Sequence, residues 1–225
     1  MIIILIFQIL IQNKMIQNNK IALIGGTGKS GKYLTQHLLN KGFAIKMLVR
    51  NPVKLTLTSP LIEVVKGDVR DFEIVRSLLI DCNVVISTLG NTKDEPPVFT
   101  HATSNILKAM NENEIRRYIL VAGLSVNAIG DKKSIGNKFK TKLMQLLFPS
   151  IVNDRQKELE ILKMSDSEWT LVRLPFIKLN ESSGEVKVKL EDCPGKYINA
   201  GNLAEFIEMQ ITDTLYLKKA PFISN

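Results

Sequence analysis

Short apolar runs alternate with longer amphipathic segments along most of the chain. The apolar runs have the length and composition of buried strands, which we predict at residues 21–24, 43–49, 62–66, 84–88, 118–122 and 169–174. The segments between them repeat apolar residues every three or four positions, which predicts helices at residues 30–41, 72–80, 97–113, 154–165 and 202–211. This alternation is typical of a parallel sheet covered by helices.

Less regular segments lie between and after these elements. Asn51-Pro52 predicts a short helix, and Asp71 and Asp154 are the expected caps of the helices that follow them. A lysine-rich excursion at residues 125–150 contains an amphipathic piece, and extended pieces are expected at residues 186–190 and 215–217. Right-handed crossovers give the strand order 3-2-1-4-5-6, so we predict a single-domain, Rossmann-type doubly wound α/β fold.

The first 14 residues differ from the rest of the chain. MIIILIFQILI is almost wholly apolar over 11 residues, whereas a membrane-spanning helix needs about 20. It has no basic region before it and no small-residue cleavage site after it, so a signal peptide fits poorly. We expect residues 1–14 to be an upstream start-site extension and residues 15–225 to form the domain. The alternative is a segment that docks on a membrane surface or a partner, without stable insertion.

Basic residues outnumber acidic ones along the chain. There are 30 Lys and Arg against 22 Asp and Glu, for a formal charge of +8. The lysines are spread from Lys14 to Lys219 and form only short clusters such as Lys132-Lys133. We expect a solvated surface with one cation-lined site for a small anion, and no dedicated nucleic-acid face.

The two cysteines, Cys82 and Cys193, have no metal-ligand spacing. We predict two free thiols in a reducing compartment, and therefore a cytoplasmic location. No His, Cys, Asp and Glu cluster has metal spacing either, so no metal site is expected.

Three glycines follow the first predicted strand. Gly25, Gly28 and Gly31 have the spacing that allows a tight turn, close approach of the backbone to a pyrophosphate and close packing of strand against helix. The helix that follows offers free N–H groups and a positive dipole end to phosphates. A P-loop is the alternative, because Gly28-Lys29-Ser30 is present, but it needs a glycine where Leu23 stands. We predict a dinucleotide site.

The end of the second strand indicates which dinucleotide is bound. A site for NAD places Asp or Glu there to hold the ribose 2′-hydroxyl, whereas this chain has Arg50. A guanidinium favours a 2′-phosphate by charge and by bidentate geometry. The expected cofactor is therefore NADP(H) in preference to NAD(H), with Lys29 and Lys54 as possible helpers.

Two later strand ends are expected at the same site. Asp68, in Gly67-Asp68-Val69 after the third strand, is a candidate acceptor for the adenine amine. Thr88-Leu89-Gly90 ends the fourth strand, where its backbone is expected to border the ribose and pyrophosphate.

The segments GGTGKSG, LVRNP, KGDVRD, VVISTLG, RRYILVAGLSV and EWTLVRLPF together resemble a known family. The chain is similar to the atypical short-chain dehydrogenase/reductases with an NmrA-like fold, and to their flavin reductase/biliverdin reductase B branch, over about residues 20–224. The resemblance implies NADPH across the carboxyl ends of the strands. It implies cofactor contacts at Gly25, Thr27, Gly28, Lys29, Ser30, Gly31, Arg50, Asp68, Val69, Leu89 and Gly90.

The resemblance also bears on the chemistry. Ser125 matches a serine near the nicotinamide, and Pro175 matches a backbone position beside the nicotinamide amide. Standard members pair the serine with Tyr-x-x-x-Lys, but the corresponding segment has Phe139 and no tyrosine. Lys142 and Arg155 are the remaining catalytic candidates.

We therefore expect an NADPH-dependent oxidoreductase that transfers hydride to a small planar acceptor, flavin- or quinone-like, and acts as a monomer or homodimer. Positioning of two rings would supply the catalysis, and solvent the proton. One alternative is a non-catalytic NADP(H) sensor of the NmrA type. Another is a sugar-nucleotide epimerase or dehydratase, which requires the tyrosine and a larger substrate domain.

Overall fold

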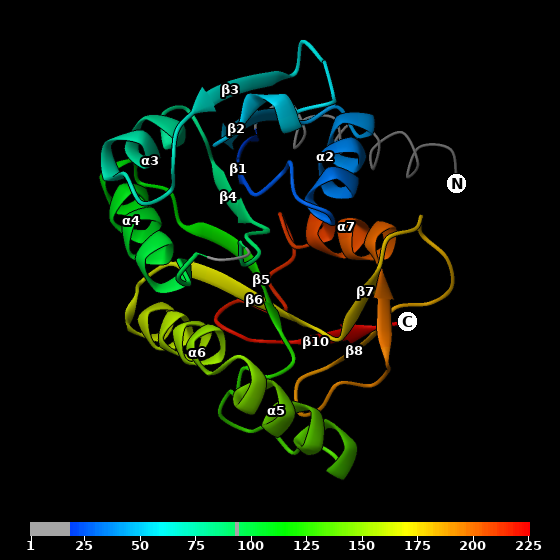
Figure 1. The fold of residues 1–225 in the computed structure, drawn as a ribbon. Helices are drawn as coiled ribbons and strands as arrows, with labels where there is room; N and C mark the ends of the chain where they lie inside the picture. Colours follow the sequence, from blue (N-terminus) through cyan, green and yellow to red (C-terminus); the bar gives the residue numbers. More distant parts are fainter. Residues whose placement is uncertain (1–18, 93–94) are drawn as a thin grey trace.

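A computed structural model describes residues 19–92 and 95–225. Its centre is a sheet in the order β3-β2-β1-β4-β5-β6-β10-β8, in which every neighbouring pair is parallel except the antiparallel pair β10 and β8 (Figure 1). The predicted Rossmann-type order 3-2-1-4-5-6 is confirmed. The strands are β1 (Lys20–Ile24), β2 (Ala44–Val49), β3 (Ile62–Lys66), β4 (Val84–Ser87), β5 (Arg117–Gly123), β6 (Glu168–Leu174), β8 (Lys187–Lys189) and β10 (Phe222–Ser224).

Helices cover both faces of this sheet (Figure 1). One face carries α2 (Gly31–Asn40) and α7 (Ala200–Met209), and the other carries α3 (Phe72–Leu79), α4 (Phe99–Glu112) and α6 (Pro149–Met164). The remaining helix α5 (Ile135–Leu147) packs beside α6, and a 3-10 turn η1 (Pro52–Lys54) follows β2. Two short strands, β7 (Phe176–Lys178) and β9 (Tyr197–Asn199), form a separate parallel pair.

The alternation of side chains along each strand divides the core into two layers. In β1, Ala22 and Ile24 face the layer under α3, α4 and α6, whereas Ile21 and Leu23 face α2 and α7. All four are essentially inaccessible to solvent. Because both faces are buried, these strands are nearly continuous apolar runs, which is why the sequence identifies them so well.

Two local expectations were wrong. No strand forms at residues 215–217, because the chain turns there: the Leu217 amide donates to the Thr214 carbonyl (3.3 Å) and Lys218 has a φ of 54°. The strand at this side of the sheet is β10, seven residues later. Asp154 does not cap its own helix, which begins at Pro149; its carboxylate accepts from the Phe99 amide (2.8 Å) and caps α4 instead.

Asp71 caps α3 as predicted, with its carboxylate accepting from the Glu73 and Ile74 amides. Residues 1–14 lie outside the described part of the chain. Within the part that is described, no helix has the length and apolar character needed to cross a bilayer.

Candidate functional site

The turn from β1 into α2 is built from glycine for reasons visible in the backbone. Gly25 has a φ of 81°, and a Cβ there would lie within 2.9 Å of the Thr88 backbone. The Gly28 amide closes the turn on the Gly25 carbonyl oxygen (2.9 Å). A Cβ on Gly31 would overlap that same carbonyl oxygen. The turn therefore tolerates no side chain at Gly25 or Gly31, and strand and helix pack as closely as the spacing predicted.

The first turn of α2 follows the glycine turn directly, and its Lys32 and Tyr33 amides donate to the carbonyls of Gly28 (3.1 Å) and Ser30 (3.1 Å). Ser30 precedes the helix, and among the described residues no side chain caps it and no acidic residue occupies its first turn. The Thr35 hydroxyl braces the arrangement by donating to the carbonyls of Gly31 (2.9 Å) and Gly26 (3.2 Å). This end of the helix is suited to an anion.

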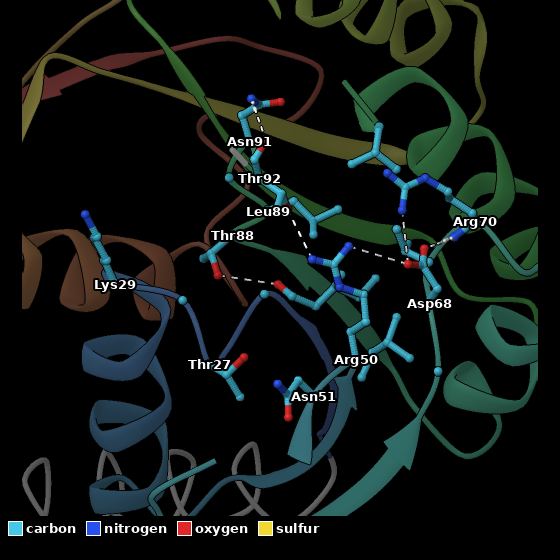
Figure 2. Close-up of a pocket in the computed structure, with 18 of the residues that line it drawn as sticks. Thr27, Lys29, Arg50, Asn51, Asp68, Arg70, Thr88, Leu89, Asn91 and Thr92 are labelled. Atoms are coloured by element: carbon cyan, nitrogen blue, oxygen red, sulfur yellow. Dashed lines mark hydrogen bonds and ion pairs between the residues drawn. The ribbon is translucent and has the colours of Figure 1, made fainter. Parts of the chain in front are cut away.

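A cavity of about 530 Å³ opens at the carboxyl ends of β1, β2, β3 and β4 (Figure 2). The predicted residues that line it are Gly25, Thr27, Gly28, Lys29, Ser30, Arg50, Asp68, Val69, Thr88, Leu89 and Gly90. Gly31 does not line the cavity itself, but it packs against the backbone of Gly25, which does. Four strand ends far apart in the sequence thus converge on one pocket, as a parallel sheet requires.

Arg50 extends from the end of β2 across the mouth of this cavity (Figure 2). Its Nη1 lies 2.7 Å from Glu95 Oε2 and 3.7 Å from Asp68 Oδ2. Arg70 completes the group, with Nη1 3.1 Å from Asp68 and Nη2 3.2 Å from Glu95. The hydrogen bond with Arg50 lowers the pKa of Glu95 and raises that of Arg50, so both stay charged.

Glu95 and Arg70 were missed as site residues. The signal was available, because loops that follow the carboxyl ends of parallel strands line the crevice, and both residues lie in such loops. Asp68 lines the cavity and also takes part in the ion pairs at its mouth. Its carboxylate accepts from the Arg70 amide (2.9 Å) and faces the two guanidinium groups, so it belongs to this charged group at the pocket mouth.

Ser125 and Pro175 each follow closely on the paired ends of β5 and β6. Gly123 pairs with Leu174, and the Leu124 amide donates to the Leu174 carbonyl (2.8 Å). Both residues are buried, and neither lines the large cavity. They form a second part of the candidate site, next to the β1–β4 part along the same edge of the sheet.

A buried cation holds the turn that carries Ser125. The Lys133 ammonium donates to the carbonyls of Leu124 (2.7 Å) and Val126 (3.1 Å) and to Asn127 Oδ1 (2.8 Å). Burial lowers the pKa of Lys133 to about 8. In the sequence, Lys133 appears only as part of the short basic cluster Lys132-Lys133. The neighbouring residues do not distinguish it from the exposed Lys132.

An ion pair between Arg173, in β6, and Asp131 supports the same turn. Arg173 is 1% exposed, and its Nη1 lies 2.6 Å from Asp131 Oδ2 and 3.1 Å from the Val126 carbonyl oxygen. The Asp131 carboxylate in turn lies 3.8 Å from the Lys133 ammonium. The Ser125 turn is therefore held by Asp131 and Lys133, which follow it closely in the sequence, and by Arg173, which comes from the distant strand β6.

The two other catalytic candidates stand apart from Ser125. Arg155 was expected at the mouth of the crevice, but the structure places it in the interior, where it donates to the Leu89 carbonyl (2.6 Å) and pairs with Glu158 (2.6 Å). Arg155 does not line the large cavity, but it binds the carbonyl of Leu89, which does. Lys142 is exposed on α5 and lines a separate cavity of about 420 Å³ together with Lys133 and Phe139.

Phe139 occupies the position where the resemblance expects a tyrosine. Tyr118 is fully buried in β5, and burial raises its pKa above the usual range, so it is no proton donor for the site. Both cysteines are free, as predicted, and the structure also buries both of them; burial raises the pKa of Cys82 to about 11. Within residues 19–92 and 95–225 no group of acidic, His or Cys side chains is arranged to hold a metal.

The sequence of the chain matches a known protein family. The sequence model of the NAD(P)H-binding family matches residues 25–214, from the glycine turn to beyond α7. The chain belongs to this NAD(P)H-binding family. The glycine cradle and the bare end of α2 fit the pyrophosphate of such a cofactor, and the cavity at the strand ends fits its adenosine half.

Several known proteins are similar to this NAD(P)H-binding chain. An uncharacterized chloroplastic protein of Arabidopsis thaliana is 24% identical over 188 residues, which cover 79% of this chain and 66% of that protein. The match to two further plant relatives covers only 34% and 32% of the lengths of those proteins. The chain thus matches a third to about two thirds of the length of these relatives.

Solved structures confirm the resemblance to short-chain dehydrogenase/reductases at the level of the fold. One from Veillonella parvula, in complex with NADP, has a TM-score of 0.73 at 15% identity, covering 92% of this chain and 94% of that one. ChuY, an anaerobillin reductase of Escherichia coli, has a TM-score of 0.76 at 16% identity, covering 92% and 96%.

Proposed function

We propose that this protein is an NADPH-dependent reductase that transfers hydride to a small planar acceptor of the flavin or quinone type. The observation that carries the cofactor preference is Arg50, a guanidinium at the end of β2 where a site for NAD has a carboxylate. Lys29 lines the same cavity and adds to its positive charge.

NADPH would supply the hydride, and the chain supplies position. The glycine turn and the positive dipole end of α2 would hold the pyrophosphate, and Leu89 and Gly90 would border the ribose. Ser125 and Pro175 would lie at the nicotinamide, on a turn that Lys133 and Arg173 keep rigid. Holding two rings together accounts for much of the rate of such a reaction, and water can protonate the reduced acceptor.

The missing tyrosine supports this choice of acceptor. A carbonyl or sugar substrate needs a proton donor at the reacting oxygen, and Phe139 stands where the family's tyrosine would supply that proton. The same observation favours a second candidate, an NADP(H) sensor of the NmrA type that passes the redox state of its ligand to a partner. Consumption of NADPH separates the two.

The setting of the protein belongs to the proposal as well. Two free, buried thiols support a reducing compartment such as the cytoplasm, with the protein acting as a monomer or homodimer. Because a structurally similar protein is an anaerobillin reductase, tetrapyrroles join flavins and quinones as acceptors to be tested.

The test is stopped-flow oxidation of NADPH and NADH with a panel of flavins, quinones and tetrapyrroles, on the wild type and Arg50→Asp. We expect turnover with at least one acceptor, a preference for NADPH, and a loss of that preference in the variant, because a carboxylate repels the 2′-phosphate. Tight binding of NADPH with no turnover would establish the sensor instead. An unchanged preference in Arg50→Asp would refute the role of Arg50.

A further inference from the structure

Glu95 brings a carboxylate to the two arginines of the cofactor site, Arg50 and Arg70. Its Oε2 lies between Arg50 Nη1 (2.7 Å) and Arg70 Nη2 (3.2 Å). A carboxylate and a phosphate are recognised by guanidinium groups through the same in-plane N–H donors. In the structure, therefore, a side chain of the protein fills the anion-binding position that the proposed function assigns to the 2′-phosphate.

We propose that Glu95 determines the cofactor specificity of this site by competing, as an internal anion, with the 2′-phosphate for Arg50 and Arg70. This inference rests on the proposed function. It adds Arg70 as a second ligand of the 2′-phosphate, and it makes the preference for NADPH a balance between two anions. The phosphate, with its larger charge, displaces the carboxylate when NADPH binds.

Asp68 faces the same two arginines but is held differently. Its Oδ1 accepts from the Arg70 amide (2.9 Å), which ties the carboxylate to its own turn after β3. Glu95 contacts both guanidinium groups through the single atom Oε2 and comes from the loop that leads into α4. Of the two carboxylates, Glu95 is the one that can leave without breaking a turn.

Partial exposure to solvent weakens the ion pairs of Glu95, so a phosphate and this carboxylate can exchange reversibly on the two arginines. The side chains of Arg50, Arg70 and Glu95 are 46%, 35% and 35% exposed, so their ion pairs are screened. The competition therefore changes affinity moderately, on the order of 3- to 10-fold, which is the range expected for partly exposed ion pairs. With NADH no phosphate enters, so Glu95 remains on the arginines and its substitution matters little.

The experiment is calorimetric titration of 2′,5′-ADP and 5′-ADP, which differ only in the 2′-phosphate, into wild type, Glu95→Gln and Glu73→Gln. Glu73 is the matched control, because it pairs with Arg76 (2.9 Å) on the exposed side of α3. We expect Glu95→Gln to bind 2′,5′-ADP about 3- to 10-fold more tightly, with 5′-ADP unchanged within about twofold. Glu73→Gln should match the wild type for both.

The outcomes separate this inference from the proposed function. If the wild type prefers 2′,5′-ADP and Glu95→Gln does not bind it more tightly, the competition is refuted and the NADPH preference stands. If the wild type shows no preference but Glu95→Gln gains one, Glu95 blocks the site outright and the competition is upheld. If neither protein discriminates, both proposals fail. Weaker binding of 5′-ADP to Glu95→Gln would make Glu95 a ribose ligand and also refute the competition.

Discussion

The two parts of the candidate site lie along one edge of one sheet but are built in different ways. At β1–β4 the cavity is shaped by backbone: the glycine turn, the start of α2 and the strand termini. At β5–β6 the Ser125 turn is held by the buried side chains of Lys133, Asp131 and Arg173. The first part uses backbone conformation, and the second uses buried side-chain charges, one of which, Arg173, comes from a distant strand.

This difference explains why one part is predictable and the other is not. A turn that needs glycine restricts residues within a few positions of each other, so Gly25, Gly28 and Gly31 reveal it directly. A buried lysine looks like any other lysine until its acceptors are known. Substitutions in the two parts should therefore have separable effects on cofactor binding and on catalysis.

The largest effect is expected in the glycine turn. Gly31→Ala places a Cβ against the Gly25 carbonyl oxygen, which forces β1 and α2 apart. We expect the free energy of unfolding to fall by about 3 kcal/mol and NADPH affinity to fall on the order of 100-fold. Urea denaturation and calorimetric titration measure the two. Gly136→Ala is the control, because a Cβ there meets nothing within 4 Å. Equal effects of both substitutions would contradict the packing argument.

A smaller effect is expected from the buried lysine. Lys133→Met removes the donor to the Leu124 carbonyl and to Asn127. We expect a loss of about 2 kcal/mol in unfolding free energy and a slower reductase step, with NADPH affinity unchanged within about twofold. Lys132→Met, whose ammonium is exposed and pairs with Glu191, should change stability by less than about 0.5 kcal/mol. A large loss of NADPH affinity in Lys133→Met would show that the two parts are coupled.

The smallest effect is a pH dependence that belongs to Lys133. Burial lowers its pKa from 10.5 to about 8 in the folded chain, so between these pH values the unfolded chain binds more protons. Stability therefore rises with pH in this window, by about 1 kcal/mol from pH 8 to pH 9. The comparison is urea denaturation of wild type and Lys133→Met at pH 7.5, 8.5 and 9.5. The difference between them should widen with pH; a constant difference would place the lysine pKa near its ordinary value.

Much of the fold was readable because its strands are buried on both faces. The fourth strand was predicted at residues 84–88 and is β4 (Val84–Ser87), which is buried throughout, and the strand order follows from the handedness of the crossovers. The errors occur where tertiary contacts decide. Asp154 caps a helix 55 residues away in sequence, and residues 215–217 turn toward β6 before the final strand begins.

The candidate site divides in the same way. The lining of the cavity was predicted in detail, whereas Glu95 was missed because its importance lies in the two arginines that it contacts. Arg155 had the polarity of a substrate contact, yet its partners Leu89 and Glu158 draw it into the interior. Residue type alone does not distinguish a charge that faces a ligand from one that supports a loop.

The last strand has a consequence for how the protein is made. Phe222, Ile223 and Ser224 in β10 are fully buried between β6 and β8, so they complete the sheet only after residue 224 has been synthesised. On the ribosome, the paired strands β1–β6 would emerge first with one edge of β6 uncovered. Until β10 has been synthesised and has paired with β6, this exposed edge is the place where chaperones would bind.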